Sequence, residues 1–379
     1  MHLRNRPGTS PGLRKARPGL RKATRFKTVV GAVAFVGVLA SCSSNGGTSA
    51  SGSATTCTPA STPTIFFVAY STPQAVYDQK IIPAFKAIWK DKHNNQNLNF
   101  EESYAASTTQ AENVVNGQPA DVVALSLAPD VDTIQQAGLI TNDWTKQPDG
   151  GMVSSSVVVF DVRPGNPKHI VDWNDLAKPG LQVLTPDPQQ SGGARWNLVS
   201  LWGSALRGDV PGVAKGSESA ATTLMDGVTK NVIAYDSSAR TSIQNFESGN
   251  GDVAITYENE VKTAQAAGGP DVAVYPKASV LIQNPVAVVD KNAEKDCVLP
   301  IAQSFVKYLH TADAKADYTD TGFLRSTNVA KAQAGDPANG FPAIKDLFTV
   351  DQLGGWDALD TKLFGDSGIA TKAVANSNQ

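Results

Sequence analysis

The chain has few of the side chains from which catalytic and metal centres are built. Its 379 residues include only four histidines and three cysteines. The histidines lie far apart and without the spacing of metal ligands, at His2, His93, His169 and His310. No P-loop, G-x-S-x-G elbow or H-E-x-x-H motif is present. We therefore expect neither an enzyme nor a bound metal or cofactor.

Acidic residues at the ends of predicted strands offer the one alternative. A catalytic carboxylate pair can be drawn from Asp121, Asp252, Glu258 and Glu260. Acids in such positions are more often solvated or cap a helix, so we do not assign them a catalytic role.

The first 41 residues lack acids altogether and carry nine cations, followed by an apolar run over residues 29–39. A basic segment, a short apolar run and small residues before a cleavage point are typical of a secretory signal. The run is too short to span a bilayer comfortably. Residues 39–42 (LASC) match a lipobox, which predicts a lipoprotein signal peptide over 1–41 and a lipidated Cys42. The alternative is an uncleaved anchor with an incidental cysteine.

Large apolar residues are also missing from the next stretch, which is mostly Ser, Gly, Thr and Ala. Such a segment cannot bury enough surface to order itself, so we expect a disordered tether over residues 42–62. Without the leader, 338 residues remain and the net charge changes from −2 to −11. This acidity argues against nucleic-acid binding, and an anion site would have to be built from local dipoles.

Lipidation of Cys42 leaves two cysteines, Cys57 and Cys297. Cysteines left over in an exported protein often pair, and a bridge here would pin the tether to the folded body. The alternative is two unrelated thiols.

Short apolar runs alternate with helix-compatible stretches through the rest of the chain, which predicts an α/β fold with mainly parallel sheets. The expected strands are Thr64–Ala69, Leu98–Ser103, Ala120–Leu125, Ser155–Val162, Gln182–Thr185, Asn231–Tyr235, Asp252–Tyr257 and Val286–Asp290. The expected helices are Gln74–Lys90, Thr109–Val115, Arg195–Leu206, Ser242–Glu247 and Leu299–His310.

Four of these strands end in hydroxyl- or glycine-rich residues that lead directly into a helix. The four junctions are residues 70–73 (YSTP), 103–109 (SYAASTT), 185–193 (TPDPQQSGG) and 236–240 (DSSAR). Helix starts expose unsatisfied N–H groups, and ligands of open α/β sheets bind at the carboxyl ends of strands. Each junction alone is better explained by ordinary helix capping. Four together predict an anion site.

A long, ordered series of motifs resembles the sulfate- and thiosulfate-binding receptors of ABC importers. The most specific part is residues 165–176 (GNPKHIVDWNDL), which continues to 191–197 (SGGARWN). Further matches are residues 120–123, 251–253, 258–260, 288–291 and 354–356. The resemblance covers most of the chain after the leader.

The resemblance implies a type II periplasmic binding protein, with two lobes, a hinge and a ligand cleft between the lobes. We expect lobe 1 to begin with residues 63–150 and lobe 2 to comprise 151–261. The chain would return to lobe 1 over 262–310. Residues 311–379 would form a C-terminal helical segment that packs across both lobes.

The resemblance also implies which residues hold the ligand: Ser71, Ser107, Ser191, Gly192, Gly193, Ala239 and Tyr257. Arg195 and Arg240 would lie behind the binding loops and spread the charge without touching the anion. The chain departs from the family where an indole donor is usual, since that position is Tyr257 here. The tyrosine hydroxyl also donates, but with a different reach.

These expectations combine into a lipid-anchored, extracytoplasmic monomer that captures sulfate, or thiosulfate, and delivers it to an ABC permease. A site made only of donors suits sulfate, because phosphate carries a proton that needs an acceptor. Asp187 or Asp236 would be that acceptor in a phosphate site. The alternatives are a receptor for phosphate or molybdate, an enzyme on the same two-lobed fold, and a receptor that senses or adheres.

Overall fold

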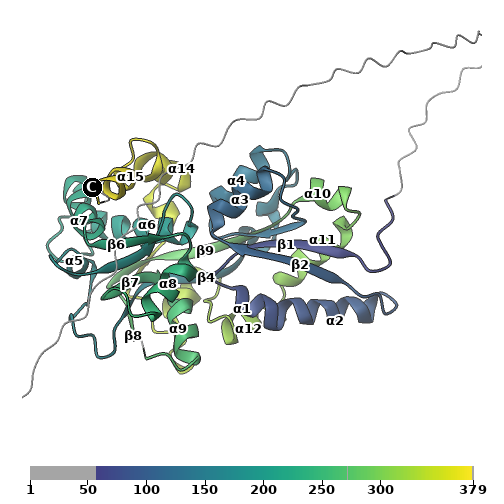
Figure 1. The fold of residues 1–379 in the computed structure, drawn as a ribbon, viewed down its shortest axis with the longest axis horizontal. Helices are drawn as coiled ribbons and strands as arrows, with labels where there is room; N and C mark the ends of the chain where they lie inside the picture. The colour runs from purple at the N-terminus through teal and green to yellow at the C-terminus, as the bar shows by residue number, and fades with distance from the viewer. Residues whose placement is uncertain (1–56, 271, 378–379) are drawn as a thin grey trace, which may run out of the picture. The chain divides into compact units, whose positions relative to one another are not determined.

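The computed structural model describes residues 57–270 and 272–377. The predicted signal sequence, Cys42 and tether residues 43–56 lie outside these ranges. No helix within the described ranges has the length and apolar character needed to cross a membrane. Strands and helices alternate along the described chain (Figure 1). The described strands form one mixed sheet, in which eight follow the order β2-β1-β3-β9-β4-β7-β5-β6, while β8 pairs with β4 and β10 with β9.

Lobe 1 begins with three parallel strands: β1 (Thr64–Tyr70), β2 (Asn99–Ala105) and β3 (Val122–Ala124). Its first helices are α1 (Gln74–Val76), α2 (Ile82–Lys92), α3 (Ser107–Val115) and α4 (Ala128–Gln136). A π-helical turn over Tyr77–Ile81 joins α1 to α2, so one helical stretch runs from Gln74 to Lys92.

The β1 side chains alternate between two hydrophobic cores, as the period of a strand requires. The Phe67 ring packs edge-on against Phe305, and the Phe305 ring in turn packs against Phe85 of α2. Val68 faces the other way, into the core that contains residues of α3 and α4. Both faces of β1 are therefore covered, and after Thr64 its sequence does not alternate between apolar and polar residues.

Two long strands, β4 (Met152–Val162) and β9 (Ala278–Val288), connect the lobes. They pair antiparallel with each other, for example at Val157 and Leu281. The end of β9 then pairs with β3 of lobe 1, whereas the end of β4 pairs with β7 of lobe 2. Each strand thus belongs to both lobes, and this pair is the hinge between them (Figure 1).

Lobe 2 contains the strands β5 (Val183–Pro186), β6 (Val232–Asp236), β7 (Val253–Tyr257) and β8 (Val272–Val274). Its helices include α5 (Trp173–Leu176), α6 (Gly192–Leu206), α7 (Glu218–Thr229), α8 (Ala239–Glu247) and α9 (Glu258–Ala266). Helix α6 is central, since 13 of its 15 residues are buried. A helix that is apolar on all sides belongs inside the protein.

The chain returns to lobe 1 along β9 and continues through α10 (Asp290–Lys295), α11 (Leu299–Leu309) and α12 (Ala312–Asp320). It then crosses back to lobe 2 with α13 (Val329–Ala334), β10 (Asp346–Phe348), α14 (Trp356–Leu359) and α15 (Ile369–Ser377). Strand β10 packs on α6 so closely that a Cβ at Gly203 would lie 2.5 Å from the Phe348 ring.

Two predicted boundaries differ from the structure. Residues 262–270 and 272–277 stay with lobe 2, because α9 extends to Ala266 and β8 pairs with β4. The three residues of β8 are too few to show a periodic pattern in the sequence. The segment 311–379 includes strand β10 as well as helices, with α12 in lobe 1 and α15 in lobe 2.

A buried ion pair fixes the C-terminal segment to the hinge region. Arg325 lies beside Ser155 of β4, with which it exchanges backbone hydrogen bonds. Its guanidinium holds both oxygens of Glu258 at 2.6 and 2.7 Å, and it also donates to the Ala332 and Pro342 carbonyls. The side chains of Arg325 and Glu258 are 2% and 0% exposed.

A disulfide joins Cys57 to Cys297, with Cα atoms 5.3 Å apart. Cys57 precedes β1, and Cys297 lies between α10 and α11. The bond therefore attaches the start of the described chain to lobe 1.

We expect Arg325→Met to lower the free energy of unfolding by about 3–5 kcal/mol, because it leaves the Glu258 carboxylate buried and uncompensated. Urea unfolding of the two proteins measures the difference. Lys362→Met is the matched control, since Lys362 pairs with Glu218 where both side chains are about half exposed. Its effect should stay below about 1 kcal/mol. Equal losses for the two variants would contradict the assignment.

We expect the double variant Cys57→Ser, Cys297→Ser to unfold at a lower temperature than the wild type. The bond spans 240 residues, and a cross-link of this kind contributes about 2–4 kcal/mol, mainly by restricting the unfolded chain. Thermal unfolding followed by circular dichroism tests this, with Cys42→Ser as the control that keeps the bridge. A double variant as stable as this control would show that the bond adds nothing.

Candidate functional site

The four predicted junctions meet at one small cavity between the lobes. Lobe 1 contributes the ends of β1 and β2 with the start of α3, and lobe 2 contributes the starts of α6 and α8 and the end of β7. The cavity has a volume of about 10 Å³, far below the ~300–1,000 Å³ typical of pockets for drug-sized ligands. Its size therefore suits a small ion better than a sugar or a peptide.

Six of the seven predicted ligand residues line this cavity: Ser71, Ser107, Ser191, Gly193, Ala239 and Tyr257. The seventh, Gly192, lies beside it with its Cα against lobe 1. A Cβ at Gly192 would come within 2.8 Å of Ser126 and Leu127, so only glycine fits. Tyr70, Thr72, Ala105 and Ala106 also line the cavity; they lie within the first two predicted junctions but are not among the predicted ligand residues. Ser126 lines the cavity from outside the four junctions.

Helix starts supply most of the donors. Ser107, Gly192 and Ala239 are the first residues of α3, α6 and α8. Their N–H groups, with that of Gly193, have no hydrogen-bond partner among the described residues. A helix start carries a partial positive charge, so three of them together favour a negatively charged ligand.

Ser191 is the N-cap residue of α6, but its side chain does not cap the helix. Its N–H donates to the Asp187 carbonyl at 2.8 Å, whereas its hydroxyl has no partner among the described residues. Ser191 is only 2% exposed and lines the cavity. The capping explanation therefore fails at this junction, and the hydroxyl remains available to a ligand.

Ser107 has its backbone N–H, but not its hydroxyl, available to a ligand in the cavity. The Ser107 Oγ donates to Asp130 Oδ2 at 2.5 Å and accepts the Ser126 N–H at 2.8 Å. Asp130 also accepts from the Thr108 hydroxyl at 3.1 Å. Burial raises the pKa of Asp130 to about 6, while these hydroxyls and the charge of Arg195 act to lower it. Asp130 does not line the cavity; it fixes the start of α3 from behind.

Ser126 and Tyr257 form the remaining wall. Tyr257 ends β7 in lobe 2, Ser126 follows β3 in lobe 1, and their side-chain oxygens are 2.7 Å apart. Burial raises the pKa of Tyr257, as it does that of Tyr70, so both phenols stay neutral. Ser126 gave no sequence signal, because it lies outside the four junctions.

Hydrogen bonds across the cleft hold the lobes together around this cavity. The N–H groups of Thr108 and Thr109, in lobe 1, both donate to the Gln190 carbonyl of lobe 2, at 3.1 and 3.3 Å. The Trp196 indole of lobe 2 donates to the Ser126 carbonyl at 3.0 Å. The second and third N–H groups of α3 are thus used in closure, and only the first faces the cavity.

Arg240 and Arg195 do not line the cavity. Arg240 forms an ion pair with the fully buried Glu260 at 2.9 Å and donates to the Thr72 carbonyl at 3.0 Å. Burial raises the pKa of Glu260, and the positive charge of Arg240 opposes part of this shift. Arg240 therefore links the lobes behind the cavity.

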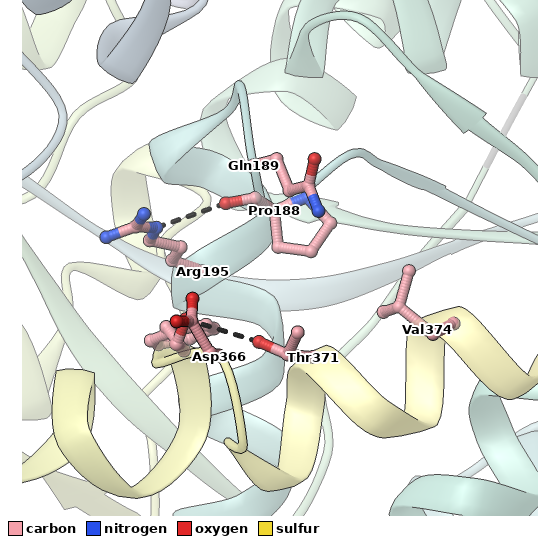
Figure 2. Close-up of a pocket in the computed structure, with 8 residues that line it drawn as sticks. Pro188, Gln189, Arg195, Asp366, Thr371 and Val374 are labelled. Atoms are coloured by element: carbon pink, nitrogen blue, oxygen red, sulfur yellow. Dashed lines mark hydrogen bonds between the residues drawn. The ribbon is translucent and has the colours of Figure 1, made fainter.

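Arg195 lies in a separate pocket between the β5–α6 loop and the C-terminal helix α15 (Figure 2). Its Nε donates to the Pro188 carbonyl at 3.1 Å, and its Nη1 is 3.4 Å from Asp360. Figure 2 shows the hydrogen bond from the Arg195 guanidinium to Pro188 of the loop. Arg195 thus supports the loop that carries Ser191.

Carboxylates are kept out of the cavity. Asp187 accepts from the Gln189 N–H and the Gln190 side chain, both at 2.9 Å. Asp236 accepts from the Asn245 amide at 3.2 Å. Across the described ranges, no group of His, Cys, Asp or Glu is arranged to hold a metal. The cavity offers hydrogen-bond donors and neutral hydroxyls.

The chain matches the family model described as "Bacterial extracellular solute-binding protein" over residues 67–324. It is 38% identical to a sulfate-binding protein of Synechococcus elongatus over 340 residues, 89% of this chain and 92% of the relative. It is 40% identical to the sulfate-binding protein of Escherichia coli K12, covering 79% of this chain and 90% of the relative. A thiosulfate-binding protein of Escherichia coli K12 is 31% identical, covering 77% and 86%.

Solved structures agree on the fold. The sulfate-binding protein SubI of Mycobacterium tuberculosis H37Rv is 34% identical, with a TM-score of 0.71 over 80% of this chain and 99% of the other. A periplasmic thiamin binding protein, 14% identical, has a TM-score of 0.58 over 83% and 96%, and shows the two-lobed α/β fold alone. This chain therefore belongs to the bacterial extracellular solute-binding proteins, a family of receptors and not of enzymes.

Proposed function

We propose that the protein captures sulfate outside the cytoplasm and delivers it to the permease of an ABC importer. The observation that carries this proposal is the convergence of free helix-start N–H groups and the Ser191 hydroxyl on one small cavity. Relatives named sulfate-binding proteins, at 38–40% identity over most of the chain, support the same ligand.

Backbone donors hold a dianion here without a cation in contact. Sulfate would accept from the N–H groups of Ser71, Ser107, Gly192, Gly193 and Ala239 and from the Ser191 hydroxyl. Tyr257 closes the remaining side. Such donors are oriented before the ligand arrives, and in a closed cleft they act in a medium of low dielectric constant.

The choice of sulfate over phosphate follows from the missing acceptor. Sulfate at neutral pH only accepts hydrogen bonds, whereas phosphate still has a proton to donate. Asp187 and Asp236, the candidate acceptors for that proton, are bonded to neighbouring amides and do not line the cavity. An unpaired phosphate hydroxyl would cost about 1–3 kcal/mol in binding free energy.

Binding and release would follow hinge motion along β4 and β9. An open form exposes the donors of both lobes, and the anion draws the lobes together until the hydrogen bonds from Thr108, Thr109 and Trp196 form. The closed form would then dock on the permease. We further propose that the protein acts as a monomer held at the outer face of the membrane by lipid on Cys42.

Thiosulfate is the second candidate ligand, because relatives at 31–34% identity are named thiosulfate-binding proteins. It has the same tetrahedral shape and charge, so the same donors would serve. Calorimetric titration of sulfate and of thiosulfate into the same protein ranks their affinities.

We expect sulfate to bind the anion-free protein that begins at Cys42, with a clear heat in isothermal titration calorimetry. Phosphate and molybdate, titrated under the same conditions, should bind at least 10-fold more weakly, since phosphate brings an unpaired hydroxyl and molybdate is larger. No heat from sulfate beside clear binding of another oxyanion would reject the proposal.

We expect Ser191→Ala to weaken sulfate binding by about 10- to 100-fold, the effect of losing one hydrogen bond to a charged ligand. The unfolding temperature without sulfate should not change, because the hydroxyl caps no helix. Ser217→Ala is the matched control, since Ser217 caps α7 through its side chain. That control should lose about 1 kcal/mol of stability and keep its sulfate affinity. The reverse pattern would show that Ser191 acts only in folding.

A further inference from the structure

Ser126 is held in place from three sides. Its N–H donates to Ser107 at 2.8 Å, and its carbonyl accepts from the Trp196 indole at 3.0 Å and from the Asn284 amide at 3.1 Å. These partners come from lobe 1, lobe 2 and the hinge strand β9 respectively. Ser126 is 1% exposed, so its side chain has a fixed origin in the cavity wall.

The Ser126 hydroxyl lies at the start of α6, among the proposed anion donors. A Cβ built on Gly192 would be only 2.7 Å from Ser126 Oγ. A Cβ on Gly193 would lie 3.6 Å from the Tyr257 ring. The two glycines therefore bring the first turn of α6 against both hydroxyl-bearing side chains.

Three hydroxyl groups, those of Ser107, Ser126 and Tyr257, lie on this side of the cavity, and each has one proton to donate. The Ser107 proton goes to Asp130 and is not available. Ser126 and Tyr257 share one hydrogen bond of 2.7 Å, which uses one of their two hydroxyl protons. Ser126 Oγ has no other hydrogen bond among the described residues. A phenol is the more acidic partner and hence the better donor, so Tyr257 donates to Ser126 and the Ser126 proton is left for the cavity.

We propose that Ser126 is a further anion-binding residue, whose hydroxyl donates to the bound oxyanion. Tyr257 is then a positioning residue that acts through Ser126, and its hydroxyl does not reach the anion. We call the hydrogen-bonded pair Tyr257 and Ser126 the relay; it takes the place of a single donor on this side of the site. This inference rests on the proposed function, since it assigns a contact to the same bound anion.

Calorimetric titration of sulfate into four proteins tests the relay: wild type, Ser126→Ala, Tyr257→Phe and the double variant. Ser126→Ala should raise Kd by about 10- to 100-fold, the effect of one hydrogen bond to an anion. Tyr257→Phe should raise Kd by up to about 10-fold, because it removes the hydrogen bond that orients Ser126 while the Ser126 hydroxyl itself remains. The double variant should bind as Ser126→Ala does, since Tyr257 acts only through the serine.

That non-additivity distinguishes positioning from a structural role, because a tyrosine that merely packs would cost the same in either background. Ser204→Ala is the matched control: Ser204 is also a fully buried serine, and it donates to the Ala278 carbonyl away from the cavity. Its sulfate affinity should equal that of the wild type. Thermal unfolding without sulfate checks that each variant is folded. If Ser126→Ala is not folded, Ser126→Cys replaces it, with nearly the same volume and a much weaker donor.

The titrations distinguish failure of the relay from failure of the proposed function. An affinity of Ser126→Ala within twofold of wild type overturns the relay. So does a cost of Tyr257→Phe that persists in the Ser126→Ala background, since Tyr257 would then touch the anion itself. No sulfate binding by the wild type overturns the proposed function and the relay together, whereas normal binding with insensitive variants overturns the relay alone.

Discussion

The N–H groups at a helix start have no partner within the helix, and this structure directs several of them at one point. A buried donor left unpaired costs free energy, so the closed arrangement around the cavity favours a ligand with several acceptors. The chain contributes the starts of α3, α6 and α8 from two lobes. Neither lobe alone holds the full set, which makes binding and closure one event.

The bonds that close the lobes are made by groups next to those that face the cavity. In α3, the Ser107 N–H faces the cavity, while the next two N–H groups bond to Gln190 of the other lobe. The Ser126 carbonyl accepts from lobe 2 and from the hinge strand, while its hydroxyl meets Tyr257. These bonds are made in the arrangement in which the donors of both lobes face the cavity.

Charged side chains lie near the cavity but do not line it. The chain without its leader is acidic, and the two arginines nearest the site are engaged behind it, with Glu260 and with Asp360. Asp130 is buried close to the cavity, but its oxygens accept from Ser107 and Thr108 and stay behind the helix start. The ligand would therefore meet dipoles and hydroxyls, which discriminate by the number and direction of hydrogen bonds instead of by charge alone.

The sequence by itself determined the α/β class, most strand positions and the four junctions, because strand period, glycine and capping residues are local signals. The motif series also gave six of the residues that line the cavity. Only the tertiary structure decided that Ser126 lines the cavity and that Asp130 supports the start of α3 from behind it, since both are brought to Ser107 from segments distant in the chain. It also decided that the chain returns to lobe 1 along β9, and that the Ser191 hydroxyl, which caps no helix, stays free for a ligand. Those outcomes depend on contacts between segments far apart in sequence, which no local pattern encodes.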